Sequence, residues 1–307
     1  MRKGRRAVPL IPVFGRAFFA SACLLSLAGC AESGPGSARW VRAQAESARE
    51  RLSESEGGLR VLDAIEAQGG LEAWYSAPTS AYFWEYSNVQ SSMRFKSYLV
   101  ADNVTRQVYH DLVSFGTPDA VEPVEARFAW DGTEAWISPG ERRQPNPRFW
   151  SLTGYYFQSI PFVMADPGVR FRVLPPEELE GIPHERVMAY YDAGVGDSSG
   201  DVYVLYLDPD TGRVAAIVYT VTYGRPYEPS PDGPEPPSTG TLLFYQDYAT
   251  VDGLTVPTRF RGYAYQAGDQ GAFRNEAWVS EISFRIPFDE SRLARPADAR
   301  VEPYPIE

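Results

Sequence analysis

From residue 81 onward, apolar and polar side chains alternate with a period of two, in one short run after another. Met93, Phe95 and Leu99 are the apolar members of residues 92–100, and residues 125–130 repeat the pattern. Successive side chains of a β-strand point to opposite faces of a sheet, so this alternation predicts half-buried strands. We therefore expect a mainly β (α+β) fold with about a dozen strands.

Short turn signals separate many of these runs. Residues 131–132, 208–212 and 252–253 contain Asp-Gly pairs or Asp and Gly together. Both residue types tolerate the positive φ that tight hairpin turns require, so we expect an antiparallel meander.

Helical spacing is confined to a few segments. Residues 38–56 are rich in Ala, Arg and Glu, and we expect a charged helix that ends at Gly57-Gly58, followed by a shorter helix over residues 59–68. Asn146-Pro147 supplies a cap and a first-turn proline for a further helix that ends before Pro161.

The first thirty residues have the pattern of an export signal. Four basic residues occur among the first six, residues 17–28 are apolar or small, and the run ends at Leu27-Ala28-Gly29-Cys30. This ending resembles the bacterial lipobox, which implies that Cys30 is the site of lipid (palmitate) attachment. We expect a lipoprotein signal peptide at residues 1–29, a lipidated tether at residues 30–37 and a single domain at residues 38–307.

Charge and the residues after Cys30 bear on location and partners. The formal net charge of -11 argues against nucleic acid as a partner, because phosphate binding requires a basic patch. Cys30 is followed by Ala31 and Glu32 and not by Asp. By lipoprotein sorting rules this favours the outer membrane of the bacterial cell envelope. We expect a monomer that is attached there through Cys30 and faces the periplasm.

Five segments resemble the LolA/LolB-like superfamily of bacterial lipoprotein carriers and, more closely, a group of outer-membrane lipoproteins within it. They are residues 64–74, 130–136, 160–169, 245–248 and 251–257. The resemblance spans about residues 59–286. It implies an unclosed antiparallel β half-barrel of about eleven strands, with an N-terminal helix and a helical lid around a hydrophobic cavity.

The strand at residues 202–207 is apolar on both faces, so it must be covered on both. Either a lidded cavity or a filled core would satisfy that requirement. The candidates for cavity lining are the bulky members of strand faces: Trp84, Phe95, Phe128, Trp136, Leu205, Tyr219, Phe244 and Trp278.

Other chemistry finds little support. Residues 196–200 match the G-x-S-x-G nucleophile pattern, but a strand follows them where the nucleophile elbow requires a helix, so we interpret them as a hairpin loop. His110 and His184 are the two histidines, and neither lies in a metal-binding motif. We expect no catalytic residue, no metal and no cofactor.

The leading hypothesis is a non-enzymatic lipoprotein that binds lipid or lipoprotein acyl chains in its half-barrel and acts in lipid or lipoprotein trafficking. The alternative is a cell-envelope scaffold or interaction protein with a filled core.

Overall fold

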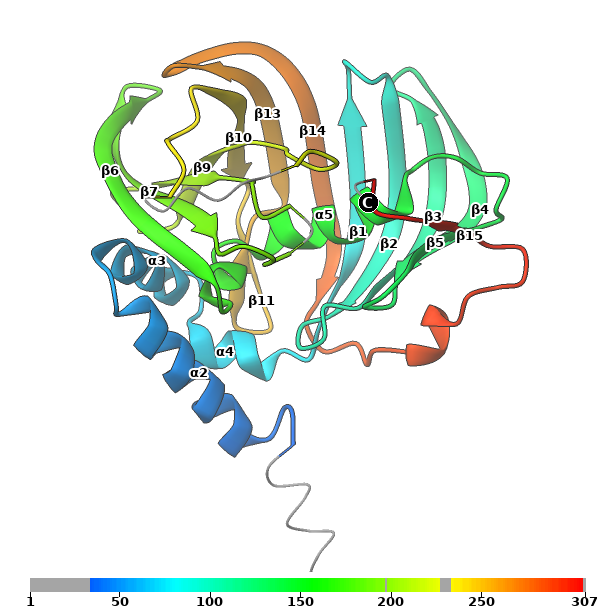
Figure 1. Ribbon diagram of the computed structural model, residues 1–307, viewed down its shortest axis with the longest axis horizontal. Helices are drawn as coiled ribbons and strands as arrows, with labels where there is room; N and C mark the ends of the chain where they lie inside the picture. The colour runs from blue at the N-terminus through cyan, green and yellow to red at the C-terminus, as the bar shows by residue number, and fades with distance from the viewer. Residues whose placement is uncertain (1–33, 197, 227–232, 306–307) are drawn as a thin grey trace, which may run out of the picture.

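The computed structural model describes residues 34–196, 198–226 and 233–305, so the predicted signal peptide and Cys30 lie outside the described residues. Thirteen strands form one strongly curled sheet in the order β15-β5-β4-β3-β2-β1-β14-β13-β10-β9-β8-β7-β6 (Figure 1). The strands of this sheet are β1 (Thr79–Asn88), β2 (Met93–Asp102), β3 (Val108–Thr117), β4 (Ala120–Trp130), β5 (Ala135–Ser138), β6 (Val169–Leu179), β7 (Ile182–Tyr191), β8 (Tyr203–Leu207), β9 (Val214–Tyr219), β10 (Thr239–Gln246), β13 (Arg259–Gln266), β14 (Asp269–Ser283) and β15 (Arg300–Glu302).

All neighbouring strands in this sheet are antiparallel, and its two edges, β15 and β6, do not pair with each other. The prediction of an unclosed antiparallel half-barrel is confirmed. The sheet has thirteen strands where the resemblance implied about eleven, and β11 (Ala249–Val251) and β12 (Leu254–Val256) form a separate hairpin. One added strand, β15, is three residues long and too short to show a period of two.

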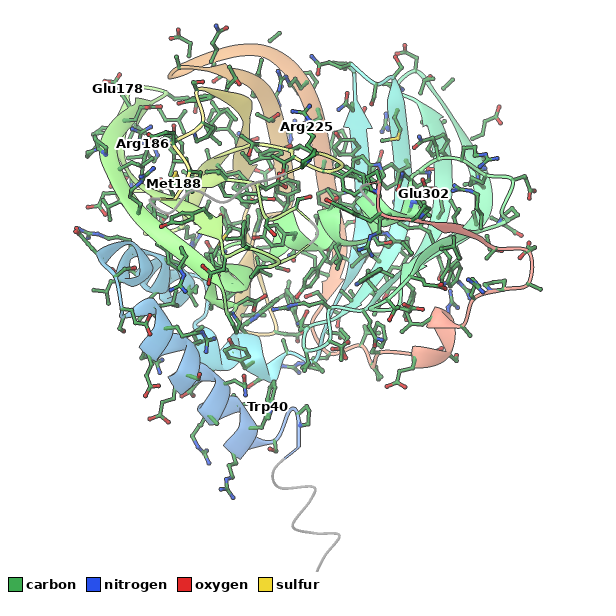
Figure 2. The ribbon with its side chains drawn as sticks, in the orientation of Figure 1. Trp40, Glu178, Arg186, Met188, Arg225 and Glu302 are labelled. Carbon is green, nitrogen blue, oxygen red and sulfur yellow. The ribbon has the colours of Figure 1, made fainter. Side chains whose placement is uncertain are left out.

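The two faces of the sheet are covered differently. We call the face that packs against the helices the inner face; it contributes most of the main hydrophobic cluster, including Trp84 and Leu205. On the opposite face, Met188 of β7 (Figure 2) and Phe244 belong to a second cluster. The chain at residues 233–234 lies against this second face, where the Arg172 guanidinium donates to the Pro234 carbonyl. β8 is therefore buried on both sides, as its composition required.

Three helices precede the sheet and lie together at one end of it: α2 (Ala38–Leu52), α3 (Glu56–Ala67) and α4 (Leu71–Ser76) (Figure 1). The prediction that Gly57-Gly58 ends the first helix is wrong, because both glycines lie in the first turn of α3, whose N-cap is Ser55. A Cβ at Gly58 would lie 2.1 Å from the Leu52 carbonyl oxygen, and one at Gly57 would lie 2.8 Å from the Phe171 Cβ. The glycines permit close packing.

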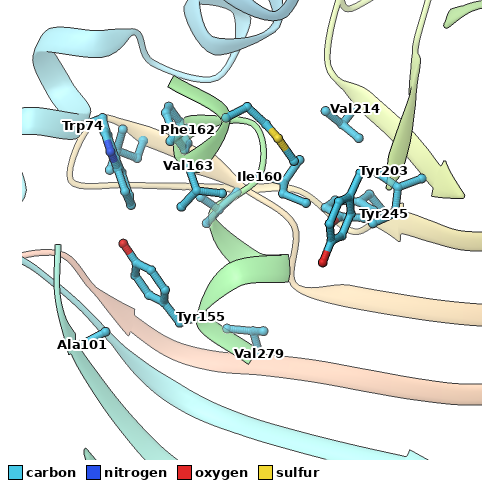
Figure 3. Packing of buried hydrophobic residues seen from close by; sticks show 14 of the residues in the cluster. Trp74, Ala101, Tyr155, Ile160, Phe162, Val163, Tyr203, Val214, Tyr245 and Val279 are labelled. Carbon is cyan, nitrogen blue, oxygen red and sulfur yellow. The ribbon is translucent and has the colours of Figure 1, made fainter. Parts of the chain in front are cut away.

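α5 (Pro147–Ser159) lies across the inner face of the sheet and continues into the 3₁₀ turn η1 (Phe162–Ala165). Its predicted start is confirmed: the Asn146 side chain accepts a hydrogen bond from the Phe149 amide, and Pro147 opens the helix. After the helix, Phe162 stacks on Trp74 of α4 with ring centroids 4.9 Å apart (Figure 3). This contact joins α5 to the N-terminal helices.

A second 3₁₀ turn, η2 (Glu290–Leu293), precedes β15, and the Leu293 carbonyl accepts a hydrogen bond from the Trp136 indole. Among the described helices, none combines the length and apolarity needed to span a lipid bilayer.

Candidate functional site: an aromatic cavity under the helices

A cavity of about 1420 Å³ lies between α5, the N-terminal helices and the inner face of the sheet. Trp84 and Tyr86 of β1 contribute to its floor, and Phe149, Tyr156 and Phe157 of α5 contribute to its wall. Pockets for drug-sized ligands typically measure about 300–1,000 Å³, so this space accommodates a larger or elongated molecule.

The cavity opens to solvent along its rim. Val104 and Val221 are each 45% exposed, although both are apolar lining residues. Trp40, at the start of α2 (Figure 2), also lines it and packs edge-on against Tyr75 of α4 with centroids 6.1 Å apart. Apolar side chains thus extend from the interior to the opening, where an apolar ligand would enter.

α5 is held close to the sheet along one side. Gly154 faces Trp84, and a Cβ at this position would lie 3.0 Å from the indole ring. The Trp84 indole nitrogen is buried and has no hydrogen-bond partner among the described residues. The same is true of both polar atoms of Gln158, one turn farther along the helix. The contact between α5 and the sheet is therefore not purely apolar. It contains buried polar atoms of a kind that usually have hydrogen-bond partners in folded proteins.

His110 of β3 connects α5 to the sheet through hydrogen bonds. Its Nε2 atom lies 2.9 Å from the Ser151 carbonyl oxygen of α5, its Nδ1 atom lies 3.0 Å from the Ser97 hydroxyl, and its ring stacks on Phe128. These partners fit a neutral ring that donates from Nε2 and accepts at Nδ1. Burial lowers the pKa of His110 to about 4, while the hydrogen bond to Ser151 acts in the opposite direction. The ring is neutral near pH 7 and serves as a structural link.

Arg106, in the turn before β3, joins the sheet to the segment after α5. Its Nη2 atom donates to both carboxylate oxygens of Asp166, at 2.6 and 2.8 Å, and its Nη1 atom donates to the Tyr155 hydroxyl. The guanidinium also lies 6.0 Å from the centre of the Trp74 ring. Two sides of the cavity are thereby held together by one cation.

Two further charges lie in the cavity wall. Asp201, just before β8, accepts hydrogen bonds at Oδ1 from the Thr222 amide (2.5 Å) and hydroxyl (2.8 Å). Burial raises the pKa of its carboxyl to about 6, against the effect of the Thr222 hydrogen bonds. Arg274 of β14 donates from Nη1 to the Gly240 carbonyl (2.8 Å) and the Thr241 hydroxyl (3.0 Å).

The eight residues predicted from the sequence separate into three groups. Trp84 and Tyr219 line the cavity. Phe95, Phe128 and Leu205 share the inner face but are at most 1% exposed and form core beneath other side chains. Trp136, Phe244 and Trp278 lie on the opposite face: Trp136 and Phe244 belong to separate buried clusters, and Trp278 pairs in register with Glu85. Choosing the bulky member of each strand could not separate the faces, because both carry large side chains.

The residues missed by sequence reasoning come mostly from α5 and the strand ends. Residues 149–157 (FWSLTGYYF) hold five aromatic side chains in nine positions, an unusual density for a helix that could have been noticed. Asp201 and Arg274 gave no local signal, because only the fold brings them into the wall of one cavity.

The sequence analysis also considered residues 196–200 and the histidines for catalysis or metal binding. Within residues 196–200, Asp197 is outside the described residues, and β8 follows the segment. His184 is buried, and its Nδ1 atom lies 2.8 Å from the Ile182 carbonyl oxygen. In the described ranges, no group of three or more His, Cys, Asp or Glu side chains is placed to hold a metal ion.

No family model matches the chain, and neither does any curated protein. Several solved structures are similar to it. A LolA superfamily protein from Nitrosomonas europaea is 11% identical with a TM-score of 0.44, over 75% of this chain and 94% of that one. A domain from Vibrio parahaemolyticus, named for outer-membrane lipoprotein sorting, is 14% identical with a TM-score of 0.34, over 83% and 97%.

The lipoprotein LppX from Mycobacterium tuberculosis is 8% identical with a TM-score of 0.26, over 75% of this chain and 98% of that one. All three identities are below 25% and all three TM-scores are below 0.5, so the ligand has to be inferred from the cavity itself.

Proposed function

We propose that this protein is a non-enzymatic, membrane-anchored lipoprotein that binds the acyl chains of a lipid or of another lipoprotein in the cavity under α5. The observation that carries the proposal is the cavity of about 1420 Å³ with its aromatic lining. Transfer of an apolar group from water contributes about 0.8 kcal/mol per CH₂. A 14-carbon chain would therefore gain on the order of 10 kcal/mol before the costs of ordering the ligand are subtracted.

The proposal includes attachment through Cys30 to the outer membrane, facing the periplasm. Trp40 lines the cavity and is ten positions after Cys30 in the sequence. Ten residues span at most about 35 Å when fully extended. An anchor at Cys30 would hold this side of the cavity within that distance of the bilayer surface, where acyl chains are available. Trafficking of lipid or lipoprotein is the cellular role that this arrangement supports.

A photoactivatable fatty acid that carries an alkyne tests both parts of the proposal in cells that produce the full chain. Without irradiation, the alkyne should label only the peptide that begins at Cys30, and Cys30→Ser should abolish that label. With irradiation, additional crosslinks should map to α5 and the inner face of the sheet.

A cavity-filling variant sharpens the test. Leu152 of α5 lines the cavity and is partly exposed, whereas Leu59 of α3 is 45% exposed and lies outside it. Leu152→Trp should reduce the light-dependent crosslinks severalfold, and the matched control Leu59→Trp should leave them unchanged. Crosslinks that are scattered over the surface, or equally frequent in both variants, would show that the cavity is not the binding site.

A further inference from the structure

Asp201 and Arg274 line the same cavity, and neither has a charged partner among the described residues. Neither forms an ion pair within residues 34–196, 198–226 and 233–305, although most ion pairs of the protein join an Arg to an Asp or Glu on a neighbouring segment. In that part of the chain, the Asp201 carboxylate accepts hydrogen bonds only from Thr222. A partly buried charge without an opposite charge is unfavourable. A bound ligand with complementary charges would therefore stabilise the charged forms of both side chains.

Strand register places tyrosines around Asp201. Tyr203 follows two positions later on the same face, and it pairs with Tyr219 of β9. On the other side of β8, Ala189 of β7 pairs with Tyr203. Because the two strands are antiparallel, Tyr191, two residues after Ala189, comes opposite Asp201, two residues before Tyr203. The Tyr203 ring is 6.1 Å from the Tyr191 ring, at 90°, and 6.1 Å from the Tyr219 ring, at 13°.

Tyr156 of α5 completes this group from the other side of the cavity. Its ring centroid is 5.3 Å from that of Tyr203, and its hydroxyl is hydrogen-bonded to the Tyr191 hydroxyl. Burial raises the pKa of Tyr203, and the charges of Tyr156 and Asp201 add to the effect. The charge of Asp201 also acts to raise the pKa values of Tyr156, Tyr191 and Tyr219, in addition to the larger effect of burial. All four tyrosines line the cavity together with Asp201.

A β-bulge directs Arg274 into the cavity. Gly262 of β13 pairs with Asn275 and Tyr263 pairs with Phe273, so Arg274 is the extra residue. Burial raises the pKa of Tyr219, the charge of Arg274 lowers it and that of Asp201 raises it. Arg274 donates to the Thr241 hydroxyl, and Thr241 pairs with Tyr219 of β9. Because Tyr219 also pairs with Tyr203 of β8, which follows Asp201 in the chain, the anion and the cation lie along one stretch of the cavity wall.

We propose that Asp201 with the surrounding tyrosines, together with Arg274, forms a subsite for the zwitterionic head group of a phospholipid, with the alkylammonium at Asp201 and the phosphate at Arg274. This rests on the proposed function, because the acyl chains of the same lipid occupy the apolar part of the cavity. Aromatic faces attract an alkylammonium group, and a carboxylate adds charge pairing. The planar guanidinium of arginine suits phosphate oxygens.

Short-chain lipids that differ only in the head group test this inference. Full-length protein in a neutral maltoside detergent is titrated with dihexanoyl phosphatidylcholine, phosphatidylethanolamine or phosphatidylglycerol, and tryptophan fluorescence is measured. All three carry the phosphate, but phosphatidylglycerol lacks the cation. The wild type should bind the two amine-bearing lipids about tenfold more tightly, which corresponds to about 1.4 kcal/mol.

Two variants and one control assign the charges. Asp201→Asn keeps an acceptor for Thr222 and should lower affinity for phosphatidylcholine and phosphatidylethanolamine to that for phosphatidylglycerol. Arg274→Gln should weaken the binding of all three lipids, because each of them carries the phosphate. Asp192→Asn, at an exposed ion pair with Arg170 outside the cavity, should change none. Circular dichroism checks that each variant is folded.

The outcomes separate the inference from the proposed function. Equal binding of all three lipids, unaffected by Asp201→Asn, would overturn the head-group subsite and leave acyl-chain binding intact. Failure of every lipid to bind would count against both. Choline chloride alone, compared with sodium chloride at equal concentration, gives a further arm: saturable binding of choline as tight as that of the lipids would identify a soluble amine as the ligand and overturn the lipid assignment.

Discussion

Protonation of His110 should loosen the attachment of α5 to the sheet. The neutral ring accepts at Nδ1 from Ser97 and donates at Nε2 to Ser151, and a second proton on the ring would remove the acceptor at Nδ1. Burial lowers the pKa of His110 to about 4, whereas the unfolded chain has the ordinary value of 6.5. Below pH 6.5 the unfolded state therefore binds the proton more readily than the folded state.

The sign and size of the effect follow from this difference. Stability that depends on neutral His110 is fully present above pH 6.5 and is lost as the pH falls towards 4. The gap between about 4 and 6.5 corresponds to about 3 kcal/mol of unfolding free energy. Carboxylates also titrate in this range, so the contribution of His110 must be taken as a difference between the wild type and a variant that does not titrate.

Urea unfolding followed by tryptophan fluorescence at pH 7.5, 6, 5 and 4 measures that difference. His110→Gln removes the titrating group, and the wild type should lose about 3 kcal/mol more than this variant between pH 7.5 and 4. Gln is expected to cost some stability at every pH through lost packing on Phe128, so the decisive quantity is the slope. A constant difference between the two proteins across the series would refute the reasoning.

Three further perturbations have definite expected results. Arg106→Met leaves a partly buried Asp166 without the guanidinium that pairs with it, and the variant should lose about 2 kcal/mol of unfolding free energy in urea. The double variant Arg106→Met/Asp166→Leu should recover more than half of that loss. A double variant less stable than Arg106→Met would contradict the pairing. Gly154→Val should lower the free energy of unfolding by about 1–3 kcal/mol, because the added side chain overpacks α5 against the sheet. Thr153→Val, on the cavity side of α5, should lower it less. Equal losses in the two variants would contradict the close approach of Gly154 to Trp84. Burial raises the pKa of Asp201 from 3.8 to about 6, so wild-type stability should fall relative to Asp201→Asn as the pH rises from about 4 to just above 6. The expected loss is about 2 kcal/mol after allowance for partial exposure, and parallel pH profiles of the two proteins would exclude the effect.

Local pattern was sufficient for much of the fold. The period of two predicted the strands, because side-chain alternation along a strand depends only on neighbouring residues. Asn146 and Pro147 predicted the start of α5, because capping is completed within one helical turn. The apolar run at residues 202–207 correctly required cover on both faces, since no part of that strand could face water.

Only the tertiary structure decided which side of each strand faces the cavity. Phe244 and Leu243 are adjacent in sequence and both are buried, yet Phe244 joins the opposite face while Leu243 lines the cavity. Likewise Asp201 and Arg274 are 73 positions apart in the sequence, and nothing near either of them in the chain indicates that they share a wall. Face and charge environment depend on how the sheet curls and on where α5 lies across it. These are long-range properties, and a periodic pattern of short runs carries no information about them.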